Sequence, residues 1–79
     1  MDEERIEVVA YAGYREEESP RTLVIGGERI EVMKVLDRWT EEEAESGVRR
    51  RCFRVKGRDF RTRTVCYDEG KQAWFCRRG

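Results

Sequence analysis

Three cysteines are the side chains best suited to bind metal or act as nucleophiles. Cys52, Cys66 and Cys76 are widely spaced, no CxxC pair occurs, and the chain has no histidine. A structural zinc ion takes four nitrogen or sulfur ligands, which usually come in closely spaced pairs. We therefore expect no metal site and interpret the cysteines as small, partly buried side chains that fill positions in a sheet.

The sequence shows no pattern of catalytic side chains. A serine or cysteine nucleophile usually needs a histidine base, and this chain has none. Carboxylates are abundant, but runs such as Glu16–Glu18 and Glu41–Glu45 are typical of solvated surfaces. Nothing indicates a buried carboxylate pair with separated pKa values. We expect no catalytic residue, no cofactor and no enzymatic activity.

Charge is distributed unevenly along the chain. Residues 1–46 hold fourteen acidic and six basic side chains, whereas residues 47–79 hold eleven basic and three acidic ones, so net charges of −8 and +8 cancel. The basic half also contains five aromatic residues. Cations that neutralise phosphates and rings that stack on bases are typical of single-stranded nucleic-acid surfaces. The candidate residues are Arg49, Arg50, Arg51, Arg54, Lys56, Arg58, Arg61 and Arg63.

Two alternatives to a nucleic-acid surface stay open. Acidic and basic strands can pair with each other across one sheet, which would use the charges inside the fold. A protein partner is the other alternative, because an exposed sheet edge or the aromatic residues Trp39 and Phe75 can anchor one. Phe75 has the opposite strand parity to Trp74, so the two rings point to different faces. Trp39 and Phe75 can equally close one end of a barrel.

The elements that would position these side chains are organised around Gly26-Gly27. Two glycines between apolar runs predict a two-residue hairpin turn, which pairs residues 22–25 with residues 30–35. The alternation of apolar and polar residues then breaks between Val32 and Leu36, which predicts a β-bulge or a strongly bent strand. A helix over residues 32–45 is the alternative, but the β-branched residues disfavour it.

Five further segments complete an all-β pattern. We predict strands over residues 5–12, 22–25, 51–56, 63–67 and 73–76, a solvated loop over 13–20, and a loop with one helical turn over 40–47, where Thr40 and Glu43 form a capping box. Six short strands predict an antiparallel meander that closes into an SH3-like barrel; a five-stranded OB-like barrel is the alternative. The expected core comprises Ile6, Val8, Leu23, Ile25, Ile30, Val32, Val35, Leu36, Phe53, Val55, Val65, Tyr67 and Trp74.

Length and composition limit the remaining possibilities. The 79 residues predict one domain with frayed ends at about 1–4 and 77–79, and a core too small to enclose a small-molecule substrate. No apolar run is long enough to span a membrane, and the acidic N-terminus lacks the apolar region of a signal peptide. We therefore expect a cytoplasmic protein, which the odd number of cysteines fits. A charged fraction of 43% with few amides is typical of thermophile proteins.

Several segments appear in an order that resembles a known family. They are Glu28-Arg29-Ile30, Leu36-Asp37-Arg38-Trp39, Cys52-Phe53-Arg54-Val55 and Tyr67-Asp68-Glu69. In this order they resemble a small bacterial family of uncharacterised single-domain all-β proteins of unknown function. The resemblance implies a β fold and brings no catalytic residues. Arg63 stands where such a family would carry an aromatic residue, which implies a shorter inner face for that strand.

These observations together predict a non-enzymatic binding or accessory module. Its most favoured partner is single-stranded nucleic acid, bound weakly through the basic residues of the second half of the chain. The alternative partner is a protein.

Overall fold

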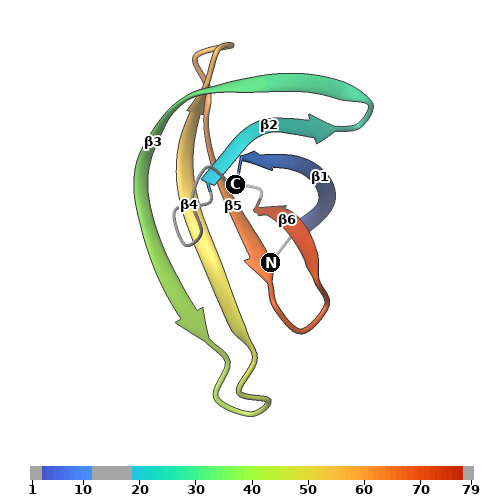
Figure 1. The fold of residues 1–79 in the computed structure, drawn as a ribbon, viewed down its shortest axis with the longest axis vertical. Coiled ribbons are helices and arrows are strands. Elements are labelled where there is room, and N and C mark those ends of the chain that lie inside the picture. Colours follow the sequence, from blue (N-terminus) through green and yellow to red (C-terminus); the bar gives the residue numbers. More distant parts are fainter. Residues whose placement is uncertain (1–2, 12–18, 78–79) are drawn as a thin grey trace.

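Six antiparallel strands form a closed barrel in the computed structural model, which describes residues 3–11 and 19–77. Each strand pairs with the next one along the chain, and β1 also pairs with β6 (Figure 1). The strands are β1 Glu3–Tyr11, β2 Ser19–Ile25, β3 Glu28–Glu42, β4 Arg49–Gly57, β5 Thr62–Asp68 and β6 Ala73–Arg77. The predicted small antiparallel barrel is confirmed, with six strands and not the five of the alternative. The finer SH3-like assignment stays a prediction.

The β2–β3 hairpin turns at the two glycines, as predicted. Gly26 and Gly27 have φ angles of 60° and 83°, the left-handed conformation that a type I′ turn requires at both central positions. The two-residue turn places Ile25 opposite Glu28, and the pairing continues to Thr22 opposite Glu31. The predicted pairing with residues 30–35 is therefore correct for Ile30 and Glu31 and wrong for residues 32–35, because so short a turn allows no offset between the strands.

Two β-bulges in β3 explain its broken alternation. The pairing between β3 and β4 shifts between Val32 and Lys34 and again between Val35 and Asp37. Each shift adds one unpaired residue, Met33 or Leu36, and these side chains are 42% and 44% exposed. The bulge prediction is confirmed, but the placement of Leu36 in the core is wrong. Because bulges increase bending and twist, the long β3 strand curves around the barrel (Figure 1).

The core lies between the face of β4–β6 that carries Phe53 and the strands β1–β3. Its buried residues are Ile6, Leu23, Ile30, Phe53, Val55, Val65 and Cys76, and Val8, Ile25, Val32, Val35 and Trp74 pack against them. Most of the expected core is therefore confirmed. Tyr67 is only half-buried and packs on Trp74 with ring centroids 5.2 Å apart. Cys76 was not expected in the core, although cysteine is among the most frequently buried residue types.

The connection after β3 contains no helix. Thr40 pairs with Arg51 inside the β3–β4 ladder, so the predicted capping box does not form and the alternative helix over 32–45 is wrong. Gly47, with a φ of 73°, donates a 2.8 Å hydrogen bond to the Glu43 carbonyl four residues earlier, which makes one helical turn. The predicted single turn is therefore present over residues 43–47, whereas residues 40–42 belong to β3 and not to the loop.

The ends of the described chain are paired. Glu3 lies opposite Arg77, and Glu4 lies opposite Cys76. Residues 3, 4 and 77 therefore belong to paired strands, and the expected fraying of the ends stays a prediction. Ser19 and Pro20 begin β2, whereas the rest of the predicted loop over 13–20 lies outside the described residues.

Candidate nucleic-acid interface

The eight basic residues predicted to bind nucleic acid divide between two ends of the barrel. Arg49, Arg50 and Arg51 begin β4, next to the β3–β4 hairpin. The other five lie along β4 and β5 toward the β4–β5 hairpin: Arg54, Lys56, Arg58, Arg61 and Arg63. Figure 1 shows these two hairpins at opposite ends of the molecule. The predicted set is therefore not one continuous surface.

At the β3–β4 end, Arg50 and Arg51 form ion pairs with carboxylates. Arg50 contacts Glu3 at 2.6 Å and Asp68 at 3.0 Å, and Arg51 Nε lies 3.3 Å from Glu69 Oε2. Burial opposes ionisation of Asp68, but hydrogen bonds from the Lys71 backbone and from Arg50 hold its pKa below the ordinary value. Arg49 is exposed and faces Glu42 in the β3–β4 register. Carboxylates therefore offset much of the positive charge at this end.

Ion pairs of Arg77 extend this network and join the basic half of the sequence to the acidic half. Arg77 contacts Glu41 at 2.6 Å and Glu3 at 3.6 Å. Hydrogen bonds from Arg77 and from the Trp39 indole lower the Glu41 pKa from 4.5 to about 2. The alternative in which opposite charges pair inside the fold is thus what the structure shows at this end.

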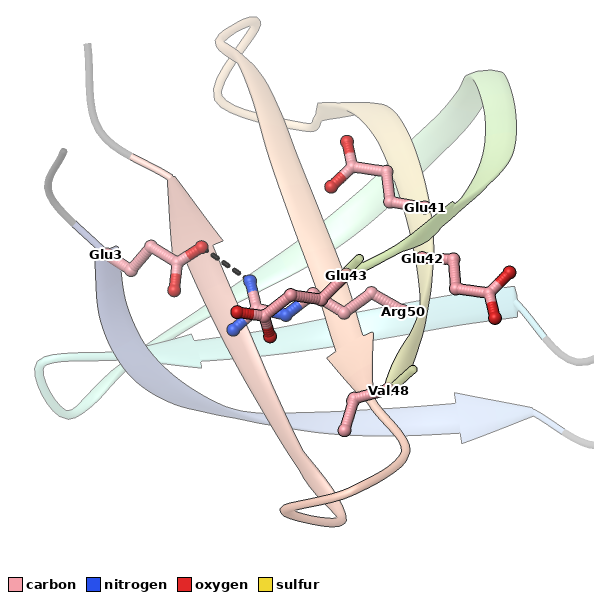
Figure 2. A pocket seen from close by; sticks show the side chains of 6 residues that line it. All are labelled: Glu3, Glu41, Glu42, Glu43, Val48 and Arg50. Carbon is pink, nitrogen blue, oxygen red and sulfur yellow. Dashed lines mark hydrogen bonds and ion pairs between the residues drawn. The ribbon is translucent and has the colours of Figure 1, made fainter. Parts of the chain in front are cut away.

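An open acidic depression of about 570 Å³ lies beside the same ion pairs. Figure 2 shows its lining residues, with Glu3 reaching toward Arg50 and with Glu41 and Glu42 coming from β3. The full lining consists of Glu3, Glu41, Glu42, Glu43, Val48 and Arg50. Within the described residues, no group of three or more His, Cys, Asp or Glu side chains is arranged to hold a metal ion.

Arg63 is also neutralised, although it belongs to the opposite end. It lies opposite Val55, its side chain is 16% exposed, and its guanidinium contacts the Asp59 carboxylate at 2.8 Å. Hydrogen bonds from Arg63 lower the pKa of Asp59 to about 2. Arg63 therefore holds Asp59 in place and is not available to a phosphate.

The remaining basic side chains gather at the β4–β5 hairpin. Lys34 on β3 lies directly opposite Lys56 on β4, and the exposed ring of Phe60 lies under the Lys56 ammonium, whose Nζ is 5.7 Å from the ring centroid. No ion pair to these basic residues occurs within the described part of the chain. We define the β4–β5 tip surface as Lys34, Arg54, Lys56, Arg58, Phe60 and Arg61.

Sequence reasoning missed two members of the β4–β5 tip surface. Lys34 belongs to the acidic half of the chain, and the Met33 bulge sets its position opposite Lys56. Phe60 lies in the turn between β4 and β5, and its exposure of 73% depends on the conformation of that turn. The only sign of this surface position in the sequence is that an aromatic residue, Phe60, stands within a basic segment.

Trp39 and Phe75, the residues predicted to contact a protein partner, share one face of the sheet. Trp39 lies opposite Cys52, Cys52 opposite Cys66, and Cys66 opposite Phe75, so the four residues form a row across β3–β6. Because Phe53, the neighbour of Cys52, points into the core, this row faces away from the core. Both rings are half-buried.

The same row contains a disulfide between Cys52 and Cys66. Both residues have 0% exposure. The interpretation of these two cysteines as simple space-filling side chains is therefore wrong. Cys76 lies outside this disulfide and is buried.

Cations cover Phe75 from within the same chain. The Arg50 guanidinium and the Lys71 ammonium each lie 5.4 Å from the centroid of its ring. These contacts use part of the ring surface that a protein partner would need.

Fold and site together define a small closed antiparallel barrel with one charge-compensated end and one basic end. Comparison with protein-family models, curated proteins and solved structures gives no match for this chain. The resemblance to a bacterial family therefore stays a prediction. The described residues contain no helix with the length and apolar character needed to cross a membrane.

Proposed function

We propose that this protein is a non-enzymatic module that binds nucleic acid through the β4–β5 tip surface. One observation carries the proposal: Lys34, Lys56, Arg58 and Arg61 lie at or beside the β4–β5 hairpin, Arg54 lies further along β4 opposite Asp37, and no carboxylate of the described residues forms an ion pair with any of these cations. Unpaired cations on one surface attract a polyanion without reading base sequence.

The electrostatic mechanism has a measurable signature. Each phosphate contact releases condensed counterions, so the logarithm of the binding constant falls by about 0.7 per log unit of salt for each contact on a single strand. Five contacts would give a slope of roughly −3.5. Binding should therefore be weak at physiological salt and much tighter at low salt.

The experiment compares the two ends of β4. Fluorescence anisotropy with a short labelled oligonucleotide, over a series of salt concentrations, would measure affinity for the wild type and two variants. We expect the Lys56→Gln/Arg58→Gln/Arg61→Gln variant to bind more weakly and to reduce the salt slope by about 2. The control is Arg49→Gln/Arg51→Gln, which removes two positive charges at the opposite end, one exposed and one ion-paired, and should bind like the wild type.

Equal losses in the two variants would contradict the proposed location of the site. Absence of binding by the wild type at low salt would contradict the proposed function itself. In that case the face with Trp39 and Phe75 becomes the leading candidate for a protein-binding surface. Strand addition stays the second protein-binding alternative, because among the described residues the segment 34–42 of β3 pairs only with β4 and leaves its other edge unpaired.

A cytoplasmic location is part of the proposal, since nucleic acid is accessible there. Disulfides are rare in cytosolic proteins of mesophiles but common in intracellular proteins of hyperthermophiles. The Cys52–Cys66 disulfide and the high charge content are both consistent with a thermophilic source.

A further inference from the structure

Phe60 occupies a backbone position that hairpins usually give to glycine. Gly57 and Arg61 close the β4–β5 hairpin, with a 2.9 Å hydrogen bond from the Gly57 amide to the Arg61 carbonyl. The Phe60 amide donates a 2.9 Å hydrogen bond to the Gly57 carbonyl, and Phe60 has a φ of 66°. This arrangement corresponds to a three-residue loop in which a type I turn is followed by one left-handed residue.

The left-handed conformation of Phe60 is unfavourable for folding. A positive φ is uncommon outside glycine, asparagine and aspartate, and it is a true outlier for a bulky side chain. Asp59 helps to hold the loop, because its carboxylate accepts hydrogen bonds from the Arg61 amide at 3.1 Å and from the Arg63 guanidinium at 2.8 Å. The surrounding loop therefore enforces the strained conformation.

Burial does not compensate for this strain. The Phe60 side chain is 73% exposed, the highest exposure of any large hydrophobic residue in the described chain, and it is not part of the core. Its ring contacts the Lys56 ammonium. Backbone strain that is not offset by favourable packing is characteristic of functional positions.

We propose that the Phe60 ring stacks on an unpaired base and makes the β4–β5 tip surface selective for single-stranded over double-stranded nucleic acid. This inference rests on the proposed function, and it assigns base contact to Phe60 and phosphate contact to the cations around it. A base stacked on Phe60 therefore has cations nearby for its phosphates, with the Lys56 ammonium beside the ring and Arg58 and Arg61 in the same loop.

A duplex cannot use this contact without distortion. Its bases already stack on each other, so an aromatic side chain reaches them only by separating a base step. The cations, in contrast, can contact the phosphates of either form. Phe60 should thus contribute to single-strand affinity and leave duplex affinity unaffected.

The test replaces Phe60 with glycine and with tyrosine. Phe60→Gly suits the backbone of the loop, so it should unfold at a higher denaturant concentration than the wild type, and any loss of binding cannot be attributed to unfolding. We expect it to bind a single-stranded oligonucleotide roughly five- to hundred-fold more weakly, with duplex affinity unchanged. Phe60→Tyr keeps an aromatic ring and should bind like the wild type.

An abasic strand of equal length provides a second probe, because it keeps the phosphates and lacks the bases. The wild type should bind it more weakly than the normal strand, whereas Phe60→Gly should bind both strands equally.

Three outcomes would overturn the inference. Single-strand affinity that is unaffected by Phe60→Gly, or duplex affinity that falls by the same factor, would show that the ring does not stack on a base. Wild-type protein that binds neither form at low salt would remove the proposed function together with the inference. Binding to both forms without a Phe60 effect would leave the electrostatic function intact.

Discussion

Trp39 and Phe75 lie in one row on the outer face of the sheet, with the Cys52–Cys66 disulfide between them. The rings belong to β3 and β6, whereas the cysteines belong to β4 and β5. Aromatic residues on both sides account for the complete burial of the two cysteines on a face that points away from the core. Two residues predicted to bind a partner therefore enclose a covalent crosslink.

Removing the Phe75 ring should expose the disulfide. Thiol–disulfide exchange requires access to a sulfur atom, so we expect Phe75→Ala to be reduced faster than the wild type by the same concentration of dithiothreitol under native conditions. The reduction rate can be followed by mass spectrometry after alkylation. Phe60→Gly is the control, because it removes an exposed ring of the β4–β5 hairpin that lies outside the row containing the disulfide. Equal rates for Phe75→Ala and the wild type would show that Phe75 does not shield the sulfurs.

The disulfide should contribute substantially to stability. It joins residues separated by 14 positions, and a loop of that length corresponds to about 3 kcal/mol in the chain-entropy model. We therefore expect Cys52→Ala/Cys66→Ala to lower the free energy of unfolding by about 3 kcal/mol, measured with guanidinium chloride. The fully reduced wild type should show a similar loss. Thiol titration of denatured, unreduced protein should find one thiol per chain, that of Cys76; three thiols would contradict the crosslink.

Acid should weaken the network around Glu41. Its pKa in the folded protein is lowered from 4.5 to about 2, so the stability that the ionised carboxylate contributes is present above about pH 4.5 and is lost as pH falls toward 2. The effect should be modest, because the Glu41 side chain is 37% exposed. We expect Glu41→Gln to lower the melting temperature at neutral pH. As pH falls from about 4.5 toward 2, the melting temperature of this variant should decrease less than that of the wild type.

Thermal unfolding over a pH series would measure this dependence. Glu42→Gln is the matched control: it is the next residue on β3, and no ion pair to it occurs in the described part of the chain. It should keep the wild-type pH profile. Identical profiles for Glu41→Gln and Glu42→Gln would refute the role given to the Glu41–Arg77 pair.

Leu36 and Val55 are both apolar, but their different exposure predicts different effects of substitution on stability. Leu36 is 44% exposed at a bulge, so Leu36→Thr should change the free energy of unfolding by less than about 0.5 kcal/mol. Val55 has 0% exposure in the core, so Val55→Ala should destabilise the protein by about 2 kcal/mol. Chemical denaturation measures both values. A large decrease in the free energy of unfolding for Leu36→Thr would indicate that Leu36 packs in the core. The register between β3 and β4 would then differ from the one described.

Local patterns in the sequence were sufficient to predict the strands and one turn. Alternating apolar residues mark β4 and β5, and Gly26-Gly27 marks the β2–β3 turn, because strand periodicity and positive φ angles depend on a few neighbouring residues. The break in alternation between Val32 and Leu36 likewise indicated a bulge. Fold class and approximate strand positions therefore followed from the sequence alone.

Contacts between strands were decided only by the tertiary structure. Which cysteines pair, which arginines meet carboxylates, and whether Lys34 faces Lys56 all depend on register between distant segments. A single bulge shifts that register by one residue and moves every later side chain to the other face. The sequence determined where strands form and that the second half is basic. Strand pairing determined which cations are neutralised, which remain at the β4–β5 tip surface, and how far Phe60 is exposed.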